Sequence, residues 1–284
     1  MKAPRFRYLK PRSLDEALAM LNQEGEGARL LAGGQSLVPA LNMRLLSPAS
    51  LIDINGVAEL TGVAERDGVL RLGALTRHAE LASSPDIARC APLVAQAAPF
   101  IAHAAIRNRG TLGGSLAHAD PAAELPACAV ALDAEFEIAG ARGRRRVKAR
   151  DFFTGIYQTN LAPGEILVAV EIPVSPPARQ SVFLELARRQ GDYALCGLAF
   201  AAEIRDGVIA DARVVYFGVG SKPIETANTA LALDGRRPGD GLGAVANALE
   251  AELEPLGDFN AGAAMKRHLA LVLLRRALGR LDAA

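Results

Sequence analysis

Residues 107–124 read "RNRGTLGGSLAHADPAAE", a stretch in which two arginines lead into a glycine pair and two carboxylates follow. Thr111 and Ser115 flank Gly113 and Gly114, so small hydroxyl groups stand beside bare backbone. Glycine lets backbone amides approach a ligand closely, and successive amides in a bend form a concavity that binds anions. The stretch therefore predicts a phosphate-binding loop, whereas a glycine pair by itself is more typical of an ordinary tight turn.

A second stretch, "LLAGGQSL" at residues 30–37, has the same design. Gly33 and Gly34 follow an apolar lead-in, and Gln35 and Ser36 add polar side chains. Neither loop matches the dinucleotide GxGxxG pattern, and no lysine follows the glycines as it does in a P-loop. The two loops together could hold a diphosphate, at a site that is neither of the Rossmann nor of the P-loop type.

Composition excludes several classes of partner. The chain of 284 residues carries a net charge of +1, so no overall field recruits nucleic acid or a membrane surface. Its three cysteines lie far apart, which is typical of reduced, buried thiols in a cytosolic protein and provides no CxxC metal framework. The sequence shows no signal segment and no run of about 18 apolar residues, so we expect a cytoplasmic protein without a transmembrane segment.

Hydrophobic periodicity divides the chain into three parts. Residues 1–57 alternate short strands and helices, and a capping box begins the first helix at Ser13. Residues 58–175 mix hairpins with an alanine-rich helical stretch. The proline-rich "SPPAR" at residues 175–179 is the best linker candidate, and three strands followed by helices fill residues 180–284.

These motifs, in this order and at this spacing, resemble the FAD-binding medium subunit of molybdenum hydroxylases, the family of carbon monoxide dehydrogenase and xanthine dehydrogenase. The similarity covers nearly the whole chain. Each motif alone is modest, and their combination is specific. The matching segments are "YLKPRSLDEALAML" (8–21), "AGGQSL" (32–37), "SPASLIDINGVAEL" (47–60), "RNRGTLGGSLAHADPAAELPA" (107–127) and "GDYA" (191–194).

The resemblance implies an α+β fold with two domains. Residues 1–175 would form a two-part FAD-binding domain of the vanillyl-alcohol-oxidase, or PCMH, type, with subdomains at 1–57 and 58–175. Residues 180–284 would form the CO dehydrogenase flavoprotein C-terminal domain, a three-stranded antiparallel sheet with helices. The linker placed from the prolines agrees with this division.

The resemblance also implies which residues contact FAD. Residues 32–36 and 111–115 would cradle the diphosphate, where backbone donors and small hydroxyls suit a dianion. Glu124 would accept a hydrogen bond from a sugar hydroxyl, and Asp120 is a weaker candidate that could instead cap the following turn. The full implied set is Ala32, Gly33, Gly34, Gln35, Ser36, Leu37, Ile101, Thr111, Gly113, Gly114, Ser115, Asp120, Glu124, Leu161 and Tyr193.

Near the expected position of the flavin, this sequence differs from those of several relatives. Tyr193 would lie beside the isoalloxazine, where an aromatic face can shield the ring. Ile101 and Leu161 would lie beside the flavin or the adenine, although either could be an ordinary core residue. Several relatives carry a flavin-contacting lysine about eight residues before the tyrosine, whereas this chain has "LEL" at residues 184–186. A cationic flavin contact is therefore not carried over.

The mode of FAD attachment is expected to be noncovalent. Some relatives have a histidine where this chain has Gln35. His103 and His118, on either side of the glycine pair at Gly113 and Gly114, form no recognisable attachment signature. The four histidines are scattered and make no metal set. The sequence names no acid–base catalyst, because the redox chemistry belongs to the cofactor.

The resemblance implies an electron-transfer subunit of an oxidoreductase. A molybdopterin-binding large subunit would oxidise the substrate, a small subunit with [2Fe–2S] clusters would relay electrons, and this chain's FAD would pass them to an external acceptor. The whole would be a dimer of heterotrimers. Two alternatives stay open: a free-standing FAD-dependent oxidoreductase of the same fold, and a non-catalytic nucleotide-binding module. The substrate and the acceptor (NAD, oxygen, quinone or a cytochrome) are not specified by the sequence.

The basic run "ARGRRRVKAR" at residues 141–150 has two interpretations. Most such runs are solvated hairpin faces, and the alternative is a docking surface for a partner subunit. Nucleic-acid binding is not expected, because no aromatic residues interleave the charges.

Overall fold

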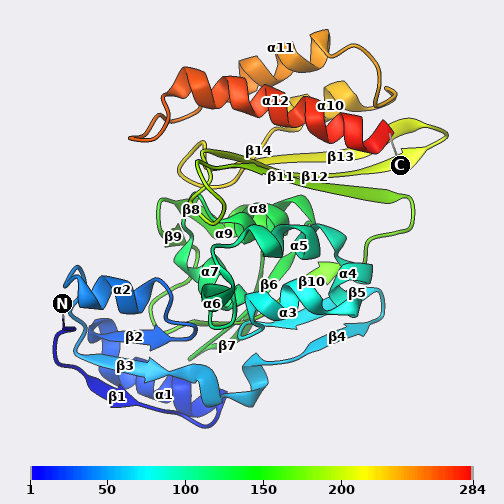
Figure 1. Ribbon diagram of the computed structural model, residues 1–284. Helices are drawn as coiled ribbons and strands as arrows, with labels where there is room; N and C mark the ends of the chain where they lie inside the picture. Colours follow the sequence, from blue (N-terminus) through cyan, green and yellow to red (C-terminus); the bar gives the residue numbers. More distant parts are fainter. Residues whose placement is uncertain (1, 283–284) are drawn as a thin grey trace.

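The computed structural model describes residues 2–282 and begins with a small α/β unit. Three parallel strands form a sheet in the order β1-β3-β2, with α1 packed against it (Figure 1). The hydroxyl of Ser13 accepts a hydrogen bond from the Glu16 amide at 3.2 Å, which confirms the predicted start of α1. The elements are β1 (Arg7–Leu9), α1 (Leu14–Glu24), β2 (Ala28–Leu31), α2 (Leu37–Asn42) and β3 (Ser50–Asp53).

The middle part contains a five-stranded antiparallel sheet in the order β4-β5-β10-β6-β7. Its strands are β4 (Val63–Arg66), β5 (Val69–Gly73), β6 (Glu135–Gly140), β7 (Gly143–Lys148) and β10 (Ile166–Pro173), and a short hairpin joins β8 (Phe153–Gly155) to β9 (Gln158–Thr159). The alanine-rich stretch forms several short helices rather than one, because Pro85 and Pro92 each begin a new helix. The helices are α3 (His78–Ser83), α4 (Pro85–Cys90), α5 (Pro92–Ala97), α6 (Ala104–Arg107), α7 (Leu112–His118), α8 (Glu124–Ala131) and α9 (Ala149–Phe152).

The last part is an antiparallel sheet covered on one side by helices (Figure 1). The three predicted strands are joined by a fourth strand of two residues, so the sheet order is β11-β12-β13-β14. The elements are β11 (Arg179–Leu186), β12 (Cys196–Arg205), β13 (Val208–Phe217), β14 (Ile224–Glu225), α10 (Ala227–Leu233), α11 (Gly243–Glu252) and α12 (Ala263–Asp282).

The two faces of this sheet belong to different cores. Leu184 and Tyr216 pack with the helices that follow the sheet, whereas Phe183 and Phe217 join the core that contains α5 and α8 of the preceding part. Neighbouring strand residues point to opposite faces, so this division follows from the period of two. α8 packs directly against β12 and β13, and the C-terminal sheet is thereby fixed on the preceding domain.

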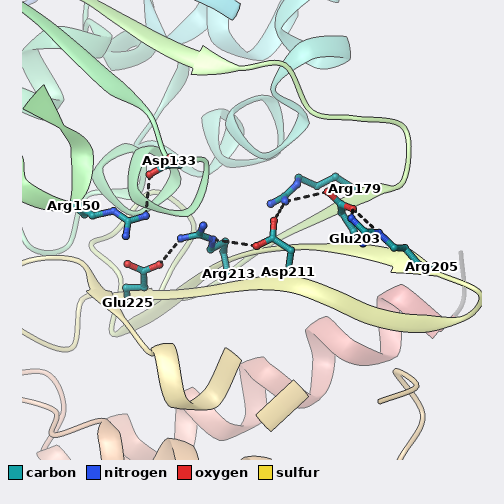
Figure 2. Close-up of polar contacts among 8 residues, drawn as sticks. All are labelled: Asp133, Arg150, Arg179, Glu203, Arg205, Asp211, Arg213 and Glu225. Carbon is teal, nitrogen blue, oxygen red and sulfur yellow. Dashed lines mark hydrogen bonds and ion pairs between the residues drawn. The ribbon is translucent and has the colours of Figure 1, made fainter. Parts of the chain in front are cut away.

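On the side of the sheet that faces the preceding domain, a row of ion pairs lies next to the apolar residues (Figure 2). Arg179 pairs with Glu203 at 3.4 Å and with Asp211, and Arg213 reaches Glu225 at 3.1 Å. A slip of β13 by one residue would turn Asp211 and Arg213 toward the apolar helices. The ladder of charges therefore favours the observed register, although each exposed ion pair adds little stability.

The basic run at residues 141–150 lies on β7 and the start of α9, and its charges are largely neutralised. Five of its six basic side chains form ion pairs with carboxylates, which supports a solvated hairpin face rather than a free basic docking surface. The five are Arg144, Arg145, Arg146, Lys148 and Arg150. Among residues 2–282, no helix has the length and apolar character needed to span a bilayer.

Candidate cofactor site

The glycine loop that comes first in the chain (residues 30–37, the first loop) packs directly on the start of the later one (residues 107–115, the second loop). A Cβ placed on Gly33 would overlap the carbonyl oxygen of Arg109 and would lie 2.7 Å from the Cα of Gly110. Gly34 has a φ of 72°, in the left-handed region that glycine adopts without strain. The two loops predicted from sequence to act together are therefore in contact, and glycine is required at Gly33 for that contact.

Two side chains bridge the loops. Asn55, after β3, donates from Nδ2 to the carbonyl oxygen of Ala32 at 2.9 Å. Arg77 donates to Asn55 Oδ1 at 2.7 Å and also to the carbonyl oxygen of Arg109. Because each side chain contacts backbone on a different segment, the pair fixes the spacing between the loops.

The amides of the first loop are available to a ligand. Within residues 2–282, no hydrogen bond engages the backbone N–H groups of residues 33–36. Their amides follow one another in a bend, which is the arrangement that binds anions. The exposed Arg109 has no carboxylate partner in the described part of the chain, so it adds an uncompensated positive charge beside them.

These donors line a cavity of about 470 Å³. Its walls come from β1, the first loop, α2, the segment after β3 and the approach to α7. Asp53 lies at the wall and accepts hydrogen bonds from the Tyr8 hydroxyl and from Asn55. The lining residues are Tyr8, Leu31, Ala32, Gly33, Gly34, Gln35, Val38, Pro39, Asn42, Asp53, Asn55 and Arg109.

The second loop differs from the first, because its amides are already engaged. Thr111 caps α7, and its hydroxyl accepts from the Gly114 amide at 3.1 Å. The amides of Leu112 and Gly113 donate to the carbonyls of Thr76 and Ala74. The first loop is therefore the main source of free backbone donors, and the second offers the Ser115 hydroxyl and an exposed backbone surface at Gly114.

The role of the glycines in the second loop is close packing. Gly113 and Gly114 lie in the first turn of α7 at ordinary φ values, so neither position needs glycine for a positive φ. A Cβ on Gly114 would lie 2.6 Å from the capping hydroxyl of Thr111, and one on Gly113 would lie 2.8 Å from the Ala74 carbonyl oxygen. Both positions thus exclude larger side chains on steric grounds.

His78 supports the second loop from inside and was missed by the sequence analysis. Its Nε2 lies 2.9 Å from the carbonyl oxygen of Thr111, and its backbone amide donates to Gly110. Only 6% of the residue is exposed, and Nδ1 has no hydrogen-bond partner among the described residues. Burial lowers the pKa of His78 to about 4, so the ring is neutral at physiological pH and donates from Nε2.

A second group of polar and aromatic residues lies at the other end of α7, about 10 Å from its first turn. Asp120 accepts from the Ala122 amide at 2.9 Å, as expected of a turn cap, and from the Tyr157 hydroxyl at 3.4 Å. The ring of Tyr157 also packs against that of His118, with 4.8 Å between ring centroids and an angle of 34° between the ring planes. Tyr193 is 73% exposed, so its ring is open to a ligand.

Two carboxyl groups near Tyr193 have perturbed acidity. Burial raises the pKa of Glu124 to about 7, and the negative charge of Asp120 adds to the rise. Burial also raises the pKa of Glu185 to about 8, with a further contribution from Glu124. Partial desolvation of its hydroxyl group, together with the negative charges of Asp120 and Glu124, raises the pKa of Tyr193. These residues therefore form one electrostatic group at the junction of the two domains.

The remaining predicted residues lie at the edges of this arrangement. Ile101 is 7% exposed and belongs to the core that contains α5 and α8, and Leu161 packs against the same core. Ser36 and Leu37 lie at the start of α2. The sequence analysis missed Asn55, Arg77, His78, Tyr157 and Glu185. Asn55 lies in the family-matching segment at residues 47–60, from which no cofactor contact was inferred, and "YQTN" at residues 157–160 carries no recognisable cofactor pattern.

The fold is that of a two-domain protein in which two glycine loops meet beside a cavity lined by free backbone donors. The family described as the FAD binding domain in molybdopterin dehydrogenase matches residues 4–175, and the CO dehydrogenase flavoprotein C-terminal domain matches residues 181–281. The chain therefore belongs to the flavoprotein medium subunits of the molybdenum hydroxylase family, whose members are oxidoreductases. This confirms the resemblance drawn from the motifs.

Relatives match over almost their whole length. The alpha subunit of the 6-hydroxypseudooxynicotine dehydrogenase complex from Paenarthrobacter nicotinovorans is 37% identical over 99% of this chain and 95% of its own. The carbon monoxide dehydrogenase medium chain of Hydrogenophaga pseudoflava is 37% identical over 98% of this chain and 97% of its own.

Solved structures agree on the fold. Carbon monoxide dehydrogenase from Hydrogenophaga pseudoflava superposes with a TM-score of 0.95 at 37% identity, covering 100% of this chain and 99% of that chain. Quinoline 2-oxidoreductase from Pseudomonas putida 86 gives a TM-score of 0.93 at 38% identity, with the same coverage. The predicted α+β flavoprotein fold is confirmed.

Proposed function

We propose that this chain binds one FAD noncovalently along α7 and acts as the flavin electron-transfer subunit of a molybdenum-containing dehydrogenase. The diphosphate would lie at the first loop and Arg109, and the flavin would lie toward Tyr157 and Tyr193. When bound, FAD supplies the ability to collect two electrons and pass them to an external acceptor. The chain's own residues position the cofactor and set the charge around it.

The observation that carries this proposal is the set of free amides in the first loop, whose residues 33–35 line a cavity together with the unpaired Arg109. Backbone donors and a guanidinium match a dianionic diphosphate better than a neutral ligand. At the other end, the exposed Tyr193 offers a ring face for the flavin, and Glu124 offers a carboxyl group for a sugar hydroxyl. The described residues therefore offer backbone donors and a guanidinium for the diphosphate at one end and an aromatic ring for the flavin at the other.

Partner subunits are proposed because the described chain holds no metal relay. Among residues 2–282, no cluster of three or more metal-ligating side chains occurs. Cys90, Cys128 and Cys196 are buried free thiols, which also supports a cytoplasmic location. The relatives named above are themselves a complex subunit and a medium chain. We propose a molybdopterin-binding large subunit and a [2Fe–2S] small subunit, arranged as a dimer of heterotrimers.

Isolation of the native material tests the assembly. Sedimentation analysis is expected to show three polypeptides in equal ratio, with one FAD per copy of this chain. A lone flavoprotein that oxidises a substrate at full rate without other subunits would favour the free-standing enzyme. A purified chain that takes up no FAD would favour the nucleotide-binding module.

Replacing Arg109 with glutamine is expected to weaken FAD binding about 10- to 100-fold, because a charge-assisted contact contributes about 1.5–3 kcal/mol. The loss should shrink at high salt, since screening weakens the same interaction in the unmodified chain. Flavin fluorescence titration at two salt concentrations measures both effects. Arg66→Gln is the matched control, because that side chain is 90% exposed and lies away from the cavity. Equal FAD affinities for the two variants would show that Arg109 does not contact the cofactor.

Replacing Tyr193 with phenylalanine is expected to leave FAD binding within about threefold of the unmodified chain. The exposed ring face, rather than the hydroxyl group, would contact the flavin. Tyr193→Ser should lose affinity, since it removes the ring and keeps a hydroxyl. Flavin content per chain after gel filtration measures both variants. A greater loss with phenylalanine than with serine would show that the hydroxyl group makes the contact.

A further inference from the structure

Glu185 is a half-buried carboxylate with an unusual environment. It lies on the domain-facing side of β11, the same side as Phe183, and its partner across the sheet is Gly197. Its Oε2 atom is fully buried and has no hydrogen-bond partner among the described residues. A buried carboxylate without partners is costly, so such a group either binds a proton or meets a ligand.

Glu124 approaches the same place from the other domain. It is the first residue of α8, which packs on β12 and β13. The amide of Gly218, at the end of β13, donates to the carbonyl oxygen of Pro121 at 2.8 Å, and buried Lys266 donates to Gly218 at 2.6 Å. These bonds hold the start of α8 against the sheet, so the relation between Glu124 and Glu185 is fixed by backbone contacts.

The surroundings of the pair are acidic or neutral. Asp120 lies before α8, Tyr193 follows β11, Tyr157 contacts Asp120, and Cys128 lies one turn along α8. Within residues 2–282, neither Glu124 nor Glu185 forms an ion pair. No cation therefore compensates the pair, and its two negative charges repel each other.

We propose that Glu124 and Glu185 act as one electrostatically coupled proton-binding group at the junction of the two domains, and that this carboxyl pair binds an additional proton when the flavin is reduced. This inference rests on the proposed function. Negative charge added to the flavin raises the affinity of nearby carboxylates for protons. The electrons come from a one-electron donor such as a [2Fe–2S] cluster, the additional proton comes from solvent, and it stays on the pair until the electrons leave.

The acidity of the two groups supports this role. The pKa of Glu124 is raised to about 7 and that of Glu185 to about 8, so the pair changes its charge near physiological pH. Two interacting carboxyl groups titrate as a unit, and the apparent values belong to the pair. The additional proton is therefore expected between about pH 7 and pH 9, where the oxidised protein has begun to lose it.

The test measures the flavin potential of the FAD-loaded complex against pH by spectroelectrochemistry with dithionite as reductant. One additional proton for each two electrons steepens the dependence by about 30 mV per pH unit. Glu185→Gln is expected to lose this additional slope, and Glu80→Gln, an exposed acid on α3, should keep it. A Glu185→Gln protein that holds FAD and keeps the full slope would overturn the proposal. Failure of the unmodified chain to hold FAD would instead count against the proposed function.

A second measurement keeps the test decisive if Glu185→Gln does not fold. Infrared spectroscopy of the unmodified protein is expected to show a protonated carboxyl band at pH 6 that disappears as the pH rises through about 8. Glu124→Gln should remove part of the band and lower the pKa of the remaining carboxyl group, because one repelling charge is gone. Absence of any such band in the unmodified protein would overturn the proposal without use of a variant.

Discussion

Replacing Gly33 with alanine is expected to abolish FAD binding while most secondary structure persists. The new Cβ would overlap the carbonyl oxygen of Arg109 and would lie 2.7 Å from the Cα of Gly110. Both obstacles are backbone atoms that cannot rotate away, so the loops must separate. Separation would break the bridge made by Asn55 and Arg77 and would spoil the array of free amides.

Flavin absorbance per chain after gel filtration, with far-ultraviolet circular dichroism, measures this outcome. Gly243→Ala is the matched control, because a Cβ at that position on α11 meets nothing within 4 Å and alanine favours a helix. Gly114→Ala should fall between the two, since its obstacle is the side-chain hydroxyl of Thr111, which can rotate at the cost of the α7 cap. One FAD for each Gly33→Ala chain would show that the cradle does not need the contact between the loops.

The sequence predicted both glycine loops and the three long C-terminal strands, because turn residues and hydrophobic periodicity are local signals. It could not distinguish the roles of the loops. The amides of Leu112 and Gly113 are engaged by residues 74–76, a pairing between segments far apart in sequence. A glycine pair looks the same whether it exposes donors to a ligand or lets a helix pack on a neighbouring strand.

The groups with shifted pKa values also could not be predicted from the sequence, because their burial depends on tertiary packing. Nothing in "TRHAE" or "FLELA" marks His78 or Glu185 as buried, because burial depends on which element covers each side chain. Once α5 packs on β11 and α8 packs on β12, Glu185 lies between domains that are separate in the sequence. The two-residue strand β14 was not predicted for a related reason. It is defined by its pairing with β13 and has no sequence pattern of its own.

Acidification is expected to destabilise the protein through His78. The folded chain has a pKa of about 4 at this residue, against about 6.5 in an unfolded chain, because burial disfavours the charged ring. Between these values the unfolded chain binds a proton that the folded chain does not, so the free energy of unfolding falls as the pH falls. Integrated down to pH 4, the loss is about 3 kcal/mol.

The loss should reach the cofactor site first, because the ring that is costly to charge is buried directly against the second loop, where it contacts Gly110 and Thr111. FAD release is therefore expected before global unfolding as the pH falls from about 6.5 toward 4. His78→Gln keeps a donor near the position of Nε2 and cannot titrate, so its free energy of unfolding should depend less on pH in this range. Denaturant unfolding at a series of pH values, with flavin content measured in parallel, provides the comparison.

Carboxylates also titrate in this range, so the deciding quantity is the difference between variants. His268→Gln is the matched control, because that histidine is exposed on α12 and lies outside the two loops of the cofactor site. If the unmodified chain and His78→Gln lose stability in parallel between pH 6.5 and 4, the ring does not resist protonation. The acid sensitivity would then belong to carboxylates such as Glu137, whose pKa is lowered in the fold, against its burial, by hydrogen bonds from Arg144 and Arg71.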